Sequence, residues 1–266
     1  MREKQSVKMN IQNDQHWFQS SLGQYLIGYE HRYFDQVVAN IFGYNAVQIG
    51  WSQFNFLRLN RVPFHFTVGL ESSTSIRAEA GFLPLHSNSM DLVILPHTLE
   101  FSPSPHQILR EVHRILIPGG HIVISGFNPL SLWGICHYLK STRQEFPWNG
   151  HFISLSRLKD WLKLLDFEMA GGRLGCYVPP FKQEKWRRHF HFMEAAGDRW
   201  WPISGGVYFL HAIKYMHGMR IIKPDWKKCM DGKKKMVPAA QRMTEASNGK
   251  RSSRKCGQAI EISDYE

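Results

Sequence analysis

The sequence lacks the features of several protein classes. It has four cysteines among 266 residues, widely spaced and without a Cys-x-x-Cys pair. That spacing argues against a zinc ribbon or a redox pair and is typical of a reducing compartment. No apolar run approaches the roughly 20 residues that span a bilayer, and no apolar core follows the charged N-terminus as in a signal peptide. We therefore expect a cytoplasmic protein without a transmembrane segment.

Hydrolase and metal-site motifs are also missing. The sequence contains no Gly-x-Ser-x-Gly nucleophile elbow and no cluster of residues at metal-ligand spacing. A hydrolase is therefore disfavoured, and no metal site is expected.

Acidic residues are too few to balance the basic ones. The chain has 33 Lys and Arg against 22 Asp and Glu, a net charge of +11. Residues 218–266 contain twelve Lys or Arg and six Asp or Glu, so this tail carries +6 of that excess. Its composition indicates a disordered, solvated extension. The alternative is that the tail attracts nucleic acid or an anionic membrane surface through charge.

The most informative stretch is residues 90–129. Asp91 opens a short apolar run at residues 92–95, which predicts a strand. Apolar residues then recur at helical spacing over residues 105–116, and Pro118-Gly119-Gly120 is predicted to end that helix. A second apolar strand follows at residues 122–125. Strand, helix, turn and strand of these lengths predict one right-handed crossover of a parallel sheet.

Several motifs in and before this stretch resemble one enzyme family. They are Ala78-Glu79-Ala80, Leu83-Pro84-Leu85, Asp91-Leu92-Val93, His97-Thr98-Leu99-Glu100 and Leu116-Ile117-Pro118-Gly119-Gly120. Their order and spacing resemble the class I S-adenosylmethionine (SAM)-dependent methyltransferases of the bacterial type 11 family. The resemblance implies an α/β fold with a doubly wound, mostly parallel, seven-stranded, Rossmann-like sheet. It also implies SAM as cofactor and methyl transfer to an acceptor, which we expect to be a small molecule.

The remaining elements follow from apolar patterns and turn residues. Strands are expected at residues 44–50, 64–70, 75–78, 169–177 and 205–215, and helices at residues 16–42, 51–59, 131–139 and 156–165, the last capped by Ser154. Only seven residues separate Glu71 from Glu79, so the helix between the second and third strands must be shortened to a loop. The expected organisation is a helical cap (1–43), a SAM-dependent methyltransferase domain (44–217) and a basic, disordered tail (218–266).

The loop after the first strand departs from the family pattern. The family places an acid and three glycines there, and glycines allow a backbone to approach a ligand closely. This chain has Gln48 in place of the acid, keeps Gly50, and has Ser52 where a second glycine would stand. The resemblance implies that these three residues contact the cofactor. The departure leaves open weaker SAM binding, a shifted binding mode or no binding.

Two carboxylates and an alanine complete the expected cofactor site. Glu71 follows the second strand, 21 residues after Gly50, which is close to the offset of the ribose-binding acid in dinucleotide folds. The resemblance implies that Glu71 accepts hydrogen bonds from the ribose. It also implies that Glu79, beside Ala80, accepts one from the adenine amino group. The alternative for both acids is an ordinary solvent-facing glutamate.

Pro96 and His97 follow the fourth strand at its carboxyl end, the edge at which open parallel sheets bind ligands. The resemblance implies that the backbone here holds the methionine part of SAM. His97 is the candidate catalytic base, because an imidazole can take a proton near neutral pH. The alternative is a histidine that caps or packs.

Basic and aromatic residues alternate over residues 179–202. This pattern suits single-stranded nucleic acid. We favour the other interpretation, an amphipathic insertion beside a methyltransferase pocket. The altered first loop, the missing helix between the second and third strands and the basic tail support a second hypothesis. The chain would then be a catalytically inactive, methyltransferase-like module that binds nucleic acid or acidic membrane.

Overall fold

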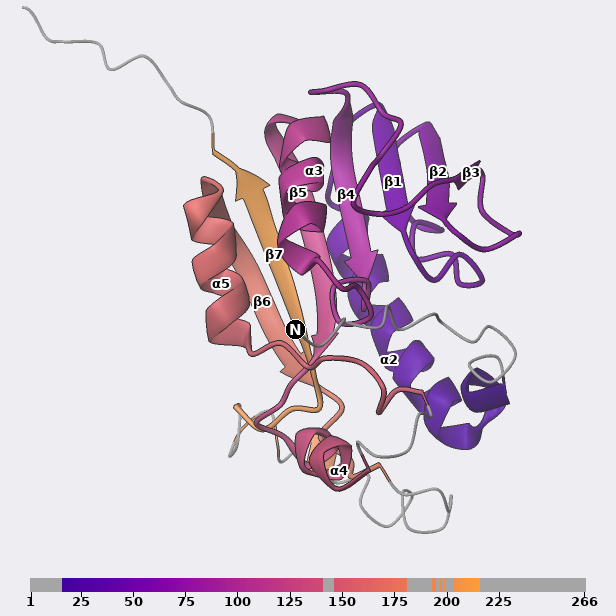
Figure 1. Cartoon of the computed structure of the whole chain (residues 1–266), viewed down its shortest axis with the longest axis vertical. Coiled ribbons are helices and arrows are strands. Elements are labelled where there is room, and N and C mark those ends of the chain that lie inside the picture. Colours follow the sequence, from indigo (N-terminus) through magenta and orange to yellow (C-terminus); the bar gives the residue numbers. More distant parts are fainter. Residues whose placement is uncertain are drawn as a thin grey trace, which may run out of the picture. The chain divides into compact units, whose positions relative to one another are not determined.

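The computed structural model describes residues 16–140, 146–180, 193–194, 197, 199 and 203–215. Seven strands form one sheet in the order β3-β2-β1-β4-β5-β7-β6 (Figure 1). The strands are β1 (Asn45–Ile49), β2 (Phe64–Gly69), β3 (Ile76–Arg77), β4 (Met90–Pro96), β5 (Leu116–Phe127), β6 (Phe167–Gly175) and β7 (Val207–Lys214). The pairs from β3 to β5 are parallel, and β7 is antiparallel to both β5 and β6. This confirms the predicted doubly wound, mostly parallel sheet.

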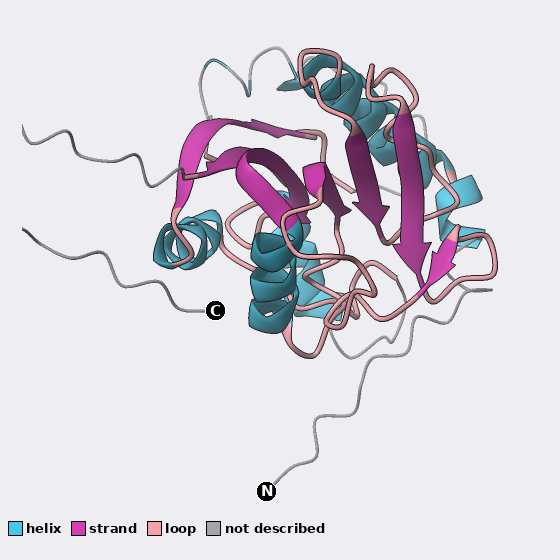
Figure 2. Ribbon diagram, turned by 90° about the horizontal axis from the view of Figure 1, so that it is seen from above, coloured by secondary structure: helices cyan, strands magenta, loops and turns pink. Residues whose placement is uncertain are grey.

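Helices cover both faces of the sheet (Figure 2). Helix α2 (Ser21–Val38) packs on one face, where its apolar side chains share a buried cluster with β1, β4 and β5. Helices α3 (Pro105–Ile115) and α5 (Leu155–Leu164) bury their apolar stripes in a second cluster on the other face. Strands covered on both sides are apolar throughout, and β4 accordingly has six fully buried residues among its seven.

The central crossover β4-α3-β5 is confirmed, but its turn is not where we predicted it. Helix α3 ends at Ile115, and Leu116 is already extended, with φ −70° and ψ 137°. Residues 118–120 lie inside β5, where Gly119 has φ +82° and the pairing with β4 is irregular. Helix α3 therefore continues directly into a long strand, and the left-handed conformation of Gly119 allows the irregular pairing of that strand with β4.

The prediction of a helix at residues 51–59 is wrong. These residues form consecutive turns, held by the side chain of Gln48 beneath them. The shortened connection between β2 and β3 is confirmed, because residues 70–75 form only turns and bends and β3 has two residues. Residues 78–89, which follow β3 without regular structure, are called the wall segment below.

Two serine side chains cap the beginnings of helices. Ser131 accepts a hydrogen bond from the backbone of Gly134 at the start of α4 (Leu132–Lys140). Ser154 caps α5 as predicted, by accepting from the backbone of Arg157 at 3.4 Å.

The tail at 218–266 and most of residues 179–202 lie outside the described residues. Within the described part of the chain, no helix is both long and apolar enough to cross a membrane.

Candidate functional site

A cavity of about 610 Å³ opens at the carboxyl ends of β1, β2 and β4. The strand order reverses here, because the chain runs outward from β1 to β3 and then returns to β4 beside β1. Ligands of open α/β sheets bind at such a reversal, and the volume lies in the usual range for small-molecule pockets. The lining residues are 49–52, 69–71, 74, 78–82, 98, 101–104, 107 and 108.

Gly50 brings the backbone to the edge of this cavity. Its φ of +84° is in the left-handed region that favours glycine. A Cβ at this position would lie 2.7 Å from Oγ1 of Thr98. That hydroxyl donates a hydrogen bond of 2.5 Å to the carbonyl of Ile49, which joins the ends of β1 and β4. The close approach of the two strand ends therefore depends on the missing side chain.

Gln48 lies beneath the loop and does not line the cavity. Its fully buried amide donates to the carbonyls of Gly50, Trp51 and Phe54 at 3.2, 3.0 and 2.7 Å. Its Oε1 accepts a hydrogen bond of 3.1 Å from the backbone of Phe56. An ionised carboxylate has no donor and cannot form the first three bonds. The glutamine thus specifies a loop that an acid at this position would not hold.

Glu71 enters the cavity lining from the end of β2. The side chain is half-buried and accepts a hydrogen bond from the hydroxyl of Ser52. Oγ of Ser52 also lies 2.6 Å from Oγ of Ser73. A carboxylate offers about four lone-pair sites, so Glu71 retains the capacity to accept from a ligand.

The wall segment supplies the opposite side of the cavity. Glu79 is exposed there, and its carbonyl accepts a hydrogen bond of 2.9 Å from the backbone of Phe82. The side chains of Phe82 and Leu70 are 65% and 64% exposed although both are large and apolar. Exposed apolar surface beside a few polar groups is the usual make-up of a ligand pocket.

His97 is held in a buried cluster of charged residues. It is fully buried and has φ +50°. Its Nδ1 lies 2.8 Å from Oε2 of Glu100, and its Nε2 lies 2.6 Å from Oε1 of Glu30 in α2. Trp51 stacks on the imidazole with ring centroids 4.7 Å apart. The other carboxylate oxygen of Glu100 accepts from the backbone of Phe127.

This cluster keeps His97 protonated. Burial lowers the pKa of the imidazole, but the facing carboxylates of Glu30 and Glu100 outweigh it and raise that pKa to about 9. Burial raises the pKa of Glu100, an effect that His97 partly offsets. With both ring nitrogens bonded to carboxylates, the imidazole has no free position from which to take a proton.

The predicted site residues fall into two groups. Gly50, Ser52, Glu71, Glu79 and Ala80 line the cavity together. The others, Gln48, Pro96 and His97, lie outside the lining, and the carbonyl of Pro96 accepts from Thr98 at 3.2 Å. The geometry argues against the catalytic role predicted for His97.

Sequence reasoning missed several residues of the site. It passed over Thr98, Leu70 and Phe82, which line the cavity, and Glu30, which holds His97 from 67 residues away. The signal for Phe82 is its position three residues after Glu79, in the same loop of the predicted site. No spacing rule connects Glu30 with His97, because their contact depends on how α2 packs on the sheet.

Comparison with protein families gives the fold its context. Residues 28–124, from α2 into β5, match the family described as "Methyltransferase domain". This part of the chain is similar to a methyltransferase domain. This match includes every predicted cofactor-binding residue, and it confirms the resemblance drawn from the motifs at residues 78–120.

Curated relatives of this domain are similar over less than half of the present chain. The protein YafS of Escherichia coli (strain K12), described as uncharacterized, is 37% identical over 114 residues, which are 43% of this chain and 45% of YafS. The chain spans about half the length of the curated relatives that it matches.

Solved structures confirm that the chain has the class I methyltransferase fold. A SAM-dependent methyltransferase of Thermotoga maritima, titled a possible histamine N-methyltransferase, has a TM-score of 0.57 and 18% identity over 77% of this chain and 96% of that one. The [4+2]-cyclase SpnF has a TM-score of 0.51 and 16% identity over 70% of this chain and 81% of its own. One fold thus carries different chemistries, and the site must decide between them.

Proposed function

We propose that this protein binds SAM in the 610 Å³ cavity and transfers its methyl group to a small-molecule acceptor. The observation that carries the proposal is the meeting of Gly50, Glu71 and Glu79 in one cavity, from three different strand ends, at the reversal of strand order.

The residues present fit the parts of the cofactor. Glu71 would accept from the ribose hydroxyls, because Ser52 uses only part of its capacity. Glu79 would accept from the adenine amino group, with Phe82 and Leu70 covering the base. Gly50 would leave room for the methionine part beside Thr98.

The protein's part in the reaction is binding, orientation and exclusion of water. Bound SAM supplies a sulfonium whose methyl group is already activated for direct displacement by a nucleophile. Holding donor and acceptor in line lowers the barrier without a further catalytic group. We assign His97 a structural role within the buried cluster and not the role of a general base, since Glu30 and Glu100 occupy both of its ring nitrogens.

The small size of the acceptor remains an expectation from the family resemblance, because SAM itself would occupy the cavity. The cytoplasmic location stays a prediction from the sequence, as does the division at residues 44 and 217. So does contact of the tail, which lies outside the described residues, with nucleic acid or anionic membrane.

A second candidate is a module that binds without catalysis. The loop held by Gln48 favours it, because three of the loop's carbonyls point to a buried amide in an arrangement that differs from a glycine-rich cradle. This alternative predicts salt-dependent binding to nucleic acid or acidic vesicles that weakens when residues 218–266 are deleted.

Calorimetric titration tests the cofactor on which the first candidate depends. SAM and S-adenosylhomocysteine are titrated into the wild type, into Glu79→Ala and into Glu168→Ala, a control that removes an exposed carboxylate on β6 away from the cavity lining. Methyl transfer predicts micromolar binding by the wild type and the control, and binding about 10-fold weaker in Glu79→Ala, as for one lost hydrogen bond to a charged group. Absence of binding to the wild type would reject the cofactor and favour the second candidate.

A further inference from the structure

The wall segment has little structure of its own. Within residues 78–89 the only backbone hydrogen bond between described residues is the one from Phe82 to Glu79. The segment's backbone is tied to the sheet at Ala78, which donates to Gly69 at 3.0 Å, and to the end of α3 through Asn88 and Ser89. Residues 79–87 between these ties depend on other contacts, and the first four of them line the cavity.

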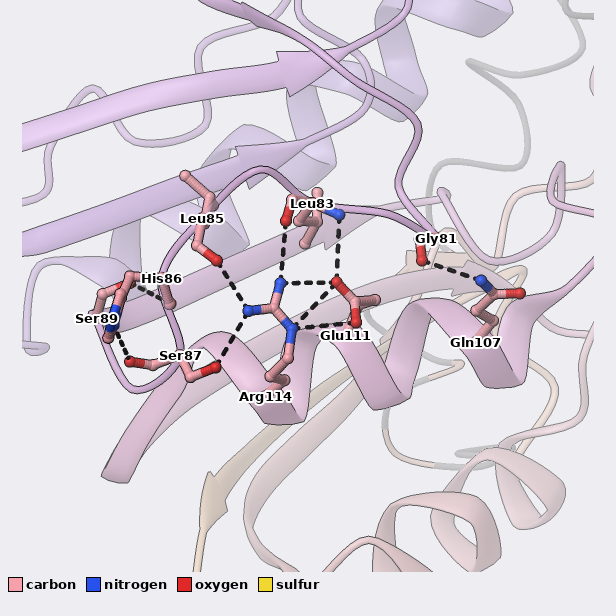
Figure 3. A network of polar contacts seen from close by, with 9 residues as sticks. All are labelled: Gly81, Leu83, Leu85, His86, Ser87, Ser89, Gln107, Glu111 and Arg114. Carbon is pink, nitrogen blue, oxygen red and sulfur yellow. Dashed lines mark hydrogen bonds and ion pairs between the residues drawn. The ribbon is translucent and has the colours of Figure 1, made fainter.

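Leu83 is buried in the apolar cluster shared with α3, and three side chains of α3 supply the polar contacts (Figure 3). We call Gln107, Glu111 and Arg114 the α3 clip. Gln107 donates to the carbonyl of Gly81 at 3.2 Å, and Glu111 accepts from the backbone of Leu83 at 3.2 Å. These residues are spaced by four and three positions, so they share one face of the helix.

Arg114 makes the largest number of these contacts. Its guanidinium donates to the carbonyls of Leu83 and Leu85 at 3.0 and 2.8 Å and to Oγ of Ser87 at 3.2 Å. Glu111 accepts from the same group at 2.8 Å and so orients it. A planar group with five donors can serve several acceptors at once, which an ammonium on a flexible chain does less well.

We propose that the α3 clip is the positioning device of this cavity: it replaces the missing helix between β2 and β3 as the support that holds Glu79 and Phe82 at the ligand. The inference rests on the proposed function for the identity of the ligand, and on the contacts alone for the support of the wall. Arg114 and Glu111 are 35% and 23% exposed, so their loss can loosen the segment without opening the buried clusters.

Amide hydrogen exchange of the ligand-free protein tests the support. Arg114→Gln is compared with Arg110→Gln, since Arg110 is exposed on the same helix and donates only to His106 within it. We expect the backbone amides of Gly81, Phe82, Leu83 and Leu85 to exchange about 10-fold faster in Arg114→Gln, while those of β4 and β5 keep their rates. Arg114→Lys should fall between the wild type and Arg114→Gln.

Two exchange results would overturn the proposal. Equal exchange of residues 81–85 in Arg114→Gln and the wild type would show that the clip is not needed. Equal acceleration in all strands would show a general loss of stability instead of a local support.

A ligand pair tests where the clip acts. S-adenosylhomocysteine carries both the nucleoside and the amino-acid part, whereas 5′-methylthioadenosine carries the nucleoside alone. If the clip positions the nucleoside part of the ligand, Arg114→Gln should lower the affinity for both ligands by the same factor, about 10-fold. A loss confined to S-adenosylhomocysteine would refute this placement. If the wild type binds neither ligand, the proposed function fails, and the exchange experiment still decides whether the clip holds the wall.

Discussion

The two sides of the cavity are held in different ways. On the side of β1 and β4, the loop at Gly50 stands on fully buried polar groups, Gln48 and the cluster around His97. On the side of β3, the wall segment is tied to α3 by half-exposed side chains. Buried polar groups are costly to leave without partners, whereas exposed ones are compensated by water. Substitutions on the first side should therefore lower the free energy of unfolding, and substitutions on the second side should lower the affinity for the ligand.

Removal of Glu30 should have the largest effect on stability. Glu30→Ala leaves a buried imidazolium with one carboxylate instead of two, and breaking a buried ion pair costs about 3–5 kcal/mol. The control is Asp35→Ala, on the same helix, which breaks a pair with the half-exposed Arg58 and should cost no more than about 1 kcal/mol. Urea unfolding measures both. Equal losses would mean that the buried cluster contributes no more than a surface pair.

Stability should also fall as the pH rises through the pKa of His97. A folded pKa of about 9 against an unfolded value of 6.5 contributes about 3 kcal/mol, fully present below pH 6.5 and lost as the pH passes 9. Glu100, whose pKa is also raised, acts in the same direction from a lower pH.

Other histidines change stability in a different pH range. Burial lowers the pKa of His211 to about 4 and also lowers that of His121, so their contributions are complete near pH 6.5. The decline of the unfolding free energy between pH 6.5 and 9.5 therefore belongs mainly to the cluster, and NMR of the His97 ring should show its titration near pH 9. A ring that titrates near 6.5 would contradict the double ion pair.

Gln48→Glu should destabilise the protein by about 2 kcal/mol, although it restores the acid of the resembling family. The new carboxylate would face the carbonyls of Gly50, Trp51 and Phe54 without a proton to donate, and unpaired buried acceptors cost about 1–3 kcal/mol. Urea unfolding and the affinity for S-adenosylhomocysteine are measured together. A variant that is as stable as the wild type and binds the ligand more tightly would show that this loop readily adopts the family's form.

Gln48 also shows how far the sequence alone could predict the site. Apolar periodicity and turn residues predicted the strands, because a buried strand needs apolar residues on both faces wherever it stands. The loop after β1 was predicted as a helix since Trp51, Phe54 and Leu57 repeat at helical spacing. The bonds from a buried amide overrode that pattern.

The candidate site was predictable where its residues follow strand ends. Gly50, Glu71 and Glu79 each lie within two residues of the end of a strand, and parallel strands bring such positions to one edge. The surroundings of His97 were not predictable, since burial and the partner Glu30 come from the packing of α2. The same applies to the α3 clip, whose helical spacing is visible but whose acceptors are backbone carbonyls without sequence identity.

Phe82→Ala should have the smallest effect on stability and still impair the ligand. The side chain is 65% exposed on the wall segment, so the free energy of unfolding should change by no more than about 0.5 kcal/mol. Affinity for 5′-methylthioadenosine should fall about 5-fold, as for a lost stacking contact with a base. Phe64→Ala, 59% exposed at the start of β2 and outside the cavity lining, is the matched control and should leave the affinity unchanged.

The two phenylalanines together decide whether the wall is a ligand surface. If Phe82→Ala binds the ligand like the wild type while Glu79→Ala does not, the adenine contacts the carboxylate of Glu79 without packing against the ring of Phe82. If Phe82→Ala instead unfolds at lower urea than Phe64→Ala, the ring contributes to packing despite its exposure, and the wall belongs with the buried side of the cavity. Weaker binding at unchanged stability is the result that separates the two sides, because only a surface held for its ligand loses function without losing the fold.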